Sequence, residues 1–255
     1  MSTATHQPLH RPARSAWEQV VRAGGVLLAV FVVLAGVLAV LGLAVVHRHG
    51  GGPIQGWDNT VERWFWDHRA HMVTASKIIA KVLDAGPLGG IVAVITVILL
   101  LARLQIRALI PLAGYIGGEA FVYVTRLYMH RPRPSTANYP APHAIAGVHE
   151  TSWSFPSGHA SGAAAVLVCL GGLAAVTWRM WWPWVIGVLA ALAVAGSRLV
   201  LGVHWFSDIV FGLAVGVPWA IIATLVLARV EWPFSWLGRR EPAEEDQGVR
   251  AFHLR

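Results

Sequence analysis

Residues 197–208 read Ser-Arg-Leu-Val-Leu-Gly-Val-His-Trp-Phe-Ser-Asp, and they mark the point where one long apolar segment ends and the next begins. His204 and Asp208 are four residues apart, so a helix that begins near His204 places both side chains on one face. The carboxylate can then hold one ring nitrogen and leave the other free as a nucleophile. A short turn would also bring Arg198 beside the ring. Taken alone, His204 and Asp208 are equally well interpreted as a capping pair at a helix start.

The composition identifies the class of protein to which this stretch belongs. Of the 255 residues, 56% are hydrophobic and 13% are charged, whereas charged residues make up about 25% of a typical soluble domain. We therefore expect an integral membrane protein. The single cysteine, Cys169, excludes an internal disulfide and a cysteine-rich metal site. The formal net charge of +7 comes from basic residues scattered between apolar runs, so membrane orientation explains it better than nucleic-acid binding.

Six segments are long and apolar enough to cross a bilayer, which takes roughly 20 residues. They are residues 24–46, 86–102, 108–128, 157–178, 184–201 and 205–228. The first is longer than the apolar region of a signal peptide, so we expect it to be retained. Aromatic residues among charges over 57–69 predict an amphipathic helix lying in the membrane interface. The predicted fold is a single all-α polytopic domain over 1–255, with a six-span core at 24–237 and cytoplasmic tails at 1–22 and 238–255.

The distribution of arginines predicts the orientation of these spans. Six spans place both termini on one side, and that side carries most arginines outside the loop at 129–156: Arg11, Arg14, Arg22, Arg103, Arg107, Arg179, Arg229, Arg239, Arg240, Arg250 and Arg255. The positive-inside rule assigns that side to the cytoplasm. We therefore expect a plasma-membrane protein whose loop at 129–156 faces the extracytoplasmic side. Arg131 and Arg133 in this loop are the kind of exception that a functional site produces.

Two further stretches end on the same side as His204. Arg126 closes the third span and is followed by Arg133-Pro134, and Pro156-Ser157-Gly158-His159 opens the fourth span. Guanidinium groups can neutralise a phosphate dianion, and the free N–H groups at a helix start can bind its oxygens. Gly158 would let the backbone approach an anion closely. Each feature alone has a simpler interpretation, as a headgroup anchor for an arginine or as a helix cap for Ser157.

In this order and spacing, the three stretches resemble the signature of the type 2 phosphatidic acid phosphatase (PAP2) family, which is related to the vanadium haloperoxidases. The resemblance covers about residues 115–212. It implies that His204 attacks phosphorus and carries a phosphohistidine, and that Asp208 fixes the tautomer of His204. His159 would protonate the leaving alkoxide and then help to activate water. The residues implied to hold the phosphoryl oxygens are Arg126, Arg133, Ser157, Gly158 and Arg198. No metal or other cofactor is expected.

One position departs from the family pattern. The first motif usually begins with Lys, whereas this chain has Arg126, which keeps the charge but changes its reach and geometry. Starting the motif so that Arg131-Pro132 forms its end would put Val124 at the basic position, so Arg126 and Arg133 are the matched pair. Glu119 lies within the third span, where we expect a structural rather than a catalytic role. In the outer loop, His130, His143, His149 and Glu150 could shape the preference for a leaving group.

We therefore expect a phosphatase that removes a terminal phosphate from a lipid phosphate or diphosphate at the extracytoplasmic face. Candidate substrates are undecaprenyl or another polyprenyl diphosphate, phosphatidylglycerol phosphate and phosphatidic acid. The expected partners are this lipid and the bilayer, and not nucleic acid. Two alternatives remain open. A lipid phosphotransferase would use the same phosphohistidine, and a non-catalytic lipid-phosphate binding or transport protein would need none of His159, His204 and Asp208.

Overall fold

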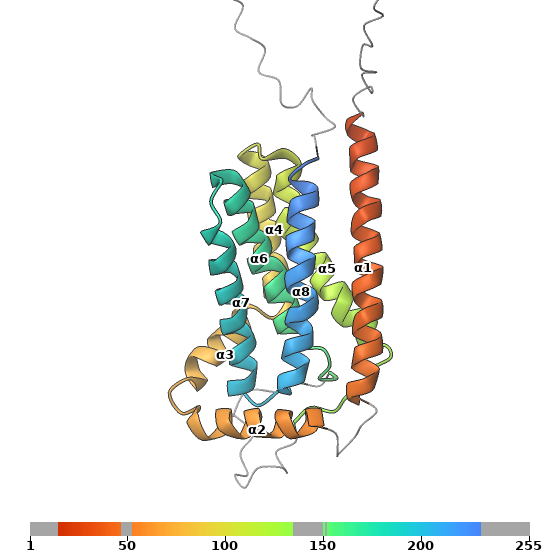
Figure 1. Ribbon diagram of the computed structural model, residues 1–255. Helices are drawn as coiled ribbons and strands as arrows, with labels where there is room; N and C mark the ends of the chain where they lie inside the picture. The colour runs from red at the N-terminus through yellow and green to blue at the C-terminus, as the bar shows by residue number, and fades with distance from the viewer. Residues whose placement is uncertain (1–14, 47–52, 135–149, 151, 231–255) are drawn as a thin grey trace, which may run out of the picture.

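A computed structural model of the chain describes residues 15–46, 53–134, 150 and 152–230. Every regular element within these residues is helical, which confirms the all-α prediction. The elements are α1 (Ala16–Val46), α2 (Pro53–His68), α3 (Val73–Val82), α4 (Ala85–Leu101), the 3₁₀ helix η1 (Gln105–Leu109), α5 (Ile110–Arg126), α6 (Gly158–Trp178), α7 (Trp182–Val200) and α8 (Phe206–Leu227). The chain is a multi-pass membrane protein, and its long helices run side by side as a bundle (Figure 1).

The number of spans depends on how the second predicted span is counted. Five helical stretches of the described residues are long and apolar enough to cross a membrane, and one of them is η1 together with α5. The second predicted span corresponds to α4, whose 17 residues extend for about 25 Å, less than the roughly 30 Å of a hydrocarbon core. The preceding helix α3 was not predicted, and it meets α4 at an angle of 60°. Counted as one broken span, α3 and α4 bring the number of spans to six.

The first helix begins eight residues before the predicted span. Ser15 and Glu18 form a capping box, in which the backbone N–H of Ser15 donates to Glu18 Oε2 (3.1 Å) and that of Glu18 donates to Ser15 Oγ (3.2 Å). This pattern ends the predicted N-terminal tail early, because Trp17 lies inside α1. Residues 1–14 of that tail, the carboxyl tail and loop residues 135–149 lie outside the described residues.

Small residues bring α5, α6 and α8 into close contact. A Cβ atom added at Gly216 would lie 2.6 Å from the carbonyl oxygen of Ser161, and one added at Gly212 would lie 2.9 Å from that of Ser157. Close backbone approach of this kind is how small residues stabilise helix pairs in membranes. The helix α1 adds Phe31, whose ring stacks on Phe121 of α5 at 4.4 Å. The bundle therefore holds the adjacent ends of α6 and α8 in a fixed relation.

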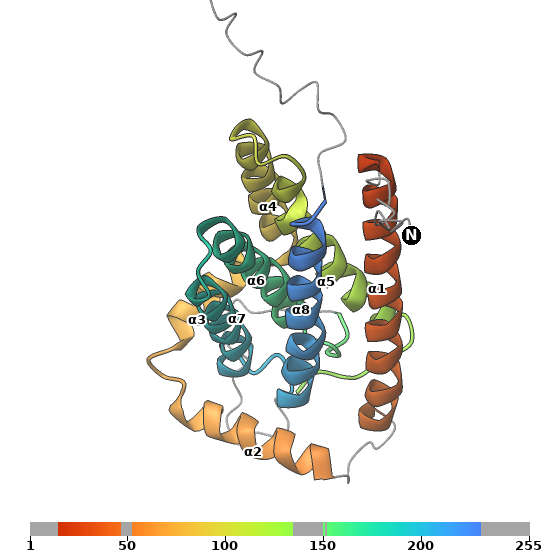
Figure 2. The same ribbon diagram turned by 45° about the horizontal axis from the view of Figure 1, so that its top comes forward.

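The interfacial helix α2 lies across one end of the bundle, beneath the ends of α7 and α8 (Figures 1 and 2). Its exposed face carries Trp57 and Trp64, which suits a membrane interface. Its opposite face carries the carboxylates of Asp58 and Glu62, which are 0% and 3% exposed. The sequence predicted this helix but not the inward direction of its acidic residues. Buried carboxylates require partners, and those of Asp58 are described below.

Candidate active site

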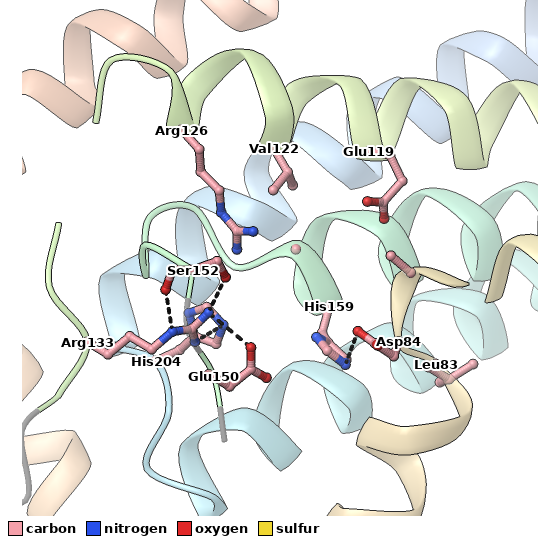
Figure 3. Close-up of a pocket in the computed structure, with 12 residues that line it drawn as sticks. Leu83, Asp84, Glu119, Val122, Arg126, Arg133, Glu150, Ser152, His159 and His204 are labelled. Atoms are coloured by element: carbon pink, nitrogen blue, oxygen red, sulfur yellow. Dashed lines mark hydrogen bonds and ion pairs between the residues drawn. The ribbon is translucent and has the colours of Figure 1, made fainter. Parts of the chain in front are cut away.

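The ends of several helices enclose one small cavity, of about 100 Å³, at the same end of the bundle as α2 (Figure 3). The helix α5 contributes its last turn, α6 its first residues, and the connection from α7 to α8 contributes His204. The break between α3 and α4 closes another side. The lining residues are Leu83, Asp84, Ala85, Glu119, Val122, Arg126, Arg133, Glu150, Ser152, Gly158, His159 and His204. Segments more than a hundred residues apart in sequence thus meet at one place.

His204 lies in the cavity wall with 1% of its surface exposed. Its Nε2 atom is 3.0 Å from Arg133 Nη1, and a guanidinium can only donate, so Nε2 is the acceptor and the ring proton resides on Nδ1. Burial lowers the pKa of His204 well below its usual value, and the charges of Arg133 and Arg198 lower it further. The imidazole is therefore neutral at neutral pH, with the lone pair of a nucleophile on Nε2.

Asp208 lies behind His204, in the first turn of α8. Its Oδ2 atom accepts from the backbone N–H of Trp205 (2.9 Å) and lies 3.5 Å from His204 Nδ1, which is longer than an ordinary hydrogen bond. Within the described residues, Nδ1 has no hydrogen-bond partner. One carboxylate thus caps α8 and also faces the imidazole, so Asp208 lies where both interpretations of the sequence require it.

Arg133 connects His204 to the loop before α6. Its Nη1 also donates to the carbonyl of Val203 (2.7 Å), and its Nε and Nη2 donate to the carbonyl (2.8 Å) and hydroxyl (2.9 Å) of Ser152. Burial lowers the pKa of Arg133 to about 10, so the guanidinium remains charged at neutral pH. These bonds hold a permanent cation directly against the nucleophilic nitrogen.

Glu150 occupies the space between two of the predicted phosphate-binding arginines. Its Oε2 accepts from Arg133 Nη2 (3.2 Å), and its Oε1 pairs with Arg198 Nη2. Burial alone would raise the pKa of Glu150, but the charges of Arg198 and Arg133 outweigh burial and lower that pKa. Arg198 is almost fully buried. The carboxylate of Glu150 thus lies between the two guanidinium groups, at the place where a phosphate was predicted to bind.

The remaining predicted phosphate ligands lie around the first turn of α6. Arg126 lines the cavity, its Nη2 donates to the carbonyl of Pro156 (3.4 Å), and its Nε has no partner within the described residues. A Cβ at Gly158 would lie 3.7 Å from Arg126 Nη2, an ordinary contact. Ser157 is fully buried, and its hydroxyl caps α6 by accepting from Ala160 N–H (3.4 Å). The structure therefore places Arg126 and Gly158 in the cavity wall and Ser157 behind it.

His159 faces the break between α3 and α4. Its Nε2 lies 3.0 Å from the carbonyl oxygen of Ala80 and 3.7 Å from Asp84 Oδ1, and Figure 3 shows the ring turned toward Asp84. A carbonyl oxygen can only accept, so Nε2 carries a proton and Nδ1 is the nitrogen left open. The broken span therefore fixes the orientation of the second histidine.

Several residues around the site were missed in the sequence or given too small a part. The buried Arg131 binds Asp208 Oδ1 (2.6 Å) and Asp58 Oδ2 (2.7 Å), although from the sequence it was considered only for its side of the membrane and for a motif register in which it was not the matched residue. Asp84 and Ser152 were not singled out. Asp84 stands just before Gly86-Pro87, a typical helix start that would have indicated the break before α4. Glu119 lines the cavity, and the missing side chain of Gly162 leaves room for its carboxylate.

Parts of the sequence are similar to known proteins. Residues 107–232 match the model of the PAP2 superfamily. Over 93 residues the chain is 31% identical to an undecaprenyl-diphosphatase from Sulfolobus acidocaldarius, covering 36% of this chain and 42% of that protein. Over 108 residues it is 34% identical to phosphatidylglycerophosphatase B from Escherichia coli strain K12, covering 39% and 37%. The matched regions span less than half the length of either relative.

The fold is similar to the crystal structure of a transmembrane PAP2 type phosphatidylglycerolphosphate phosphatase from Bacillus subtilis. The TM-score is 0.61 at 21% sequence identity, and the match covers 82% of this chain and 98% of the other. At this identity the likeness concerns the arrangement of helices. The family match adds the sequence pattern, and it includes all eight residues predicted to form the site. Residues 107–232 of this chain therefore form a PAP2 superfamily domain.

Proposed function

We propose that this protein is an integral membrane phosphatase that removes a terminal phosphate from a lipid phosphate or diphosphate through a phosphohistidine on His204. The observation that carries the proposal is the cavity itself. A neutral, buried imidazole faces the same space as a second histidine and the guanidinium groups of Arg126 and Arg133, with Arg198 joined to the cavity through Glu150. This set supplies a nucleophile, an acid and a cationic cradle.

In the proposed mechanism, Nε2 of His204 attacks phosphorus while the bond to the leaving oxygen breaks. The protonated His159 gives its proton to that oxygen, and Asp208 stabilises the positive charge that develops on His204. His159 then accepts a proton from a water molecule, whose oxygen attacks the phosphohistidine and releases phosphate. The arginines stabilise the charge on the equatorial oxygens in both steps.

The site needs one rearrangement before this attack. Arg133 donates to the same Nε2 lone pair that must reach phosphorus, and Glu150 binds both Arg133 and Arg198. A phosphoryl group can replace Glu150 as the partner of both arginines and draw Arg133 away from the ring. We therefore propose that Glu150 holds the cradle together until substrate arrives.

Replacing Glu150 with glutamine is expected to raise the affinity for an inorganic phosphate analogue. Removing the carboxylate removes a competing anion, and because its pKa is lowered, the carboxylate competes throughout the neutral range. We expect vanadate to inhibit about 5-fold more tightly, which corresponds to roughly 1 kcal/mol for a partly exposed pair. The measurement is the inhibition constant in the Glu150→Gln and native proteins. Weaker vanadate inhibition would mean that Glu150 organises the arginines instead of competing for them.

The position of the site supports a lipid as substrate. The cavity lies at helix ends, and Leu83 and Val122 line it beside the charged groups. A phosphate at this depth can enter the cavity while its hydrocarbon tail stays in the bilayer. The relatives named above act, by their names, on undecaprenyl diphosphate and phosphatidylglycerophosphate. We propose these two lipids, other polyprenyl diphosphates and phosphatidic acid as candidates.

The same distribution of arginines supports an extracytoplasmic site. Arg22, Arg103, Arg107, Arg179 and Arg229 lie near the helix ends that point away from the cavity. By the positive-inside rule that end faces the cytoplasm. We propose that the cavity faces the outside, that both termini are cytoplasmic, and that residues 1–255 act as a single domain.

The decisive experiment is a phosphate-release panel across lipid diphosphates and monophosphates in EDTA. We expect release to continue in EDTA, because the arginines supply the positive charge that a magnesium ion supplies in other phosphatases. Strict dependence on added magnesium would contradict the mechanism. A labelled lipid or sugar acceptor added to the same assay separates hydrolysis from transfer, since a phosphotransferase would convert the labelled acceptor into its phosphate ester and a hydrolase would leave it unchanged. Binding without any turnover would favour a non-catalytic lipid-binding protein.

A further inference from the structure

The buried face of α2 is joined by a chain of hydrogen bonds to Asp208, the carboxylate that faces the nucleophile. Asp58 lies in α2 and is 0% exposed. Its Oδ1 accepts from the backbone N–H of Ser207 (2.7 Å), and its Oδ2 accepts from the Ser207 hydroxyl (2.7 Å) and from Arg131 Nη2 (2.7 Å). The carboxylate of Asp58 is thus fully occupied at the start of α8.

Arg131 is the central member of this chain. Its Nη1 donates to Asp208 Oδ1 (2.6 Å) and to the hydroxyl of Ser207 (2.7 Å), and only 4% of the residue is exposed. One guanidinium therefore bridges two buried carboxylates, Asp58 and Asp208. The planar fork of arginine suits this geometry, and the single ammonium of lysine does not reproduce it.

The chain fixes the orientation of the carboxylate that faces His204. Arg131 holds Oδ1 of Asp208, and the N–H of Trp205 holds Oδ2 from one direction, so Oδ2 stays 3.5 Å from His204 Nδ1. When the imidazole becomes cationic on attack, its Nδ1–H can close on an acceptor that is already in place. Asp58 also shares the positive charge of Arg131 with Asp208. Arg131 therefore does not by itself cancel the negative charge of the carboxylate that faces His204.

We propose that Arg131, held by Asp58 of the interfacial helix, is a positioning residue for His204, so that α2 forms part of the catalytic unit. This inference rests on the proposed phosphatase function. The simpler explanation is that the buried charges only anchor α2 to the bundle. The two explanations differ, because an anchor affects folding and positioning affects the imidazole.

The kinetic test compares Arg131→Met, Arg131→Lys and Asp58→Asn with the control Glu62→Gln. Glu62 is a buried carboxylate one turn further along the same face of α2, so it reports on the anchoring of this helix. We expect kcat to fall about 100-fold in Arg131→Met and about 10-fold in Asp58→Asn, with a smaller fall in Arg131→Lys than in Arg131→Met and KM within about 3-fold throughout. In an Asp208→Asn background, Asp58→Asn should have little further effect.

A second measurement does not depend on turnover. In protein labelled with ¹⁵N-histidine in nanodiscs, the signals of His204, assigned with a His204→Gln variant, should show the Nδ1–H tautomer. Arg131→Met and Asp58→Asn should shift the Nδ1 signal, because Asp208 then no longer faces that N–H in a fixed orientation, and Glu62→Gln should leave the signals unchanged. Unchanged His204 signals in Arg131→Met, or equal kinetic losses in Glu62→Gln, would overturn the inference. If the native protein released no phosphate from any lipid, the proposed function would fail, and the tautomer measurement would still decide the positioning role.

Discussion

Replacing His204 with alanine is expected to abolish phosphate release, with kcat/KM lower by roughly 10⁴-fold or more, as for other catalytic nucleophiles. The reason is that, within the described cavity, His204 combines an unprotonated ring nitrogen beside a guanidinium with a carboxylate that faces its other ring nitrogen. The measurement is phosphate release from a lipid diphosphate, with thermal stability measured in parallel. The exposed His71 offers a matched control, since His71→Ala removes an imidazole outside the cavity.

The same variant tests the covalent intermediate. Brief exposure of native protein to a ³²P-labelled lipid phosphate should trap an acid-labile, base-stable phosphoenzyme, and His204→Ala should trap none. His159→Ala should slow release of phosphate from the intermediate, because His159 activates the attacking water in the proposed mechanism. A labelled intermediate that persists in His204→Ala would show that another residue is the nucleophile.

Replacing Arg198 with alanine is expected to cause the second largest loss, about 10²–10³-fold in kcat, the usual effect of removing one donor that stabilises a developing oxyanion. Arg198 is almost fully buried and pairs with Glu150 between the cavity and α7. Its loss removes a cation from the cradle and leaves Glu150 bound to Arg133 alone. Arg198→Lys should retain more activity because the charge remains, although the two-pronged geometry is lost.

The control for this prediction is Arg229→Ala, since Arg229 follows α8 at the opposite end of the bundle and is exposed. The kinetic constants should be measured over lipid concentrations from below KM up to saturation, so that a change in kcat is separated from a change in KM. A rise in KM with kcat unchanged would indicate that Arg198 binds the substrate and transition state equally. That result would remove Arg198 from transition-state stabilisation.

Much of the fold and the convergence at the cavity could be predicted, because both depend on strong local signals. Long apolar runs require helices in a bilayer, and their alternating direction brings Arg126, Gly158, Arg198 and His204 to one end. The start of α1 could also have been predicted from Ser15 and Glu18, a capping pattern that was overlooked. The spacing of His204 and Asp208 predicted their proximity correctly, and their catalytic roles stay predictions.

The rest depends on contacts between distant segments. The helix α3 is short and is separated from α4 by a bend at Leu83 and Asp84. This bend matters because Ala80 and Asp84 contact His159. In the sequence, Asp58 resembles any acidic residue on an amphipathic helix. Its partner Arg131 lies 73 residues further along the chain, and only the folded structure brings the two together. Glu150 likewise acquires a partner in Arg198 only through tertiary structure. Pairings of this kind have no periodicity that a single sequence reveals.

The tight seating of α8 on α6 has a consequence for how such a protein can diversify. Gly212 and Gly216 bring the two backbones into contact, and the N–H of Ser157 donates to the carbonyl of Asp208 (3.1 Å). The segments that carry the two histidines are thus held rigidly against each other. The helices α3, α4 and α5 form the opposite wall of the cavity. Substitutions in that wall that leave Ala80, Asp84 and Arg126 in place can alter which hydrocarbon chain is accepted without moving the imidazoles relative to each other, so substrate range can evolve while the reaction chemistry is kept.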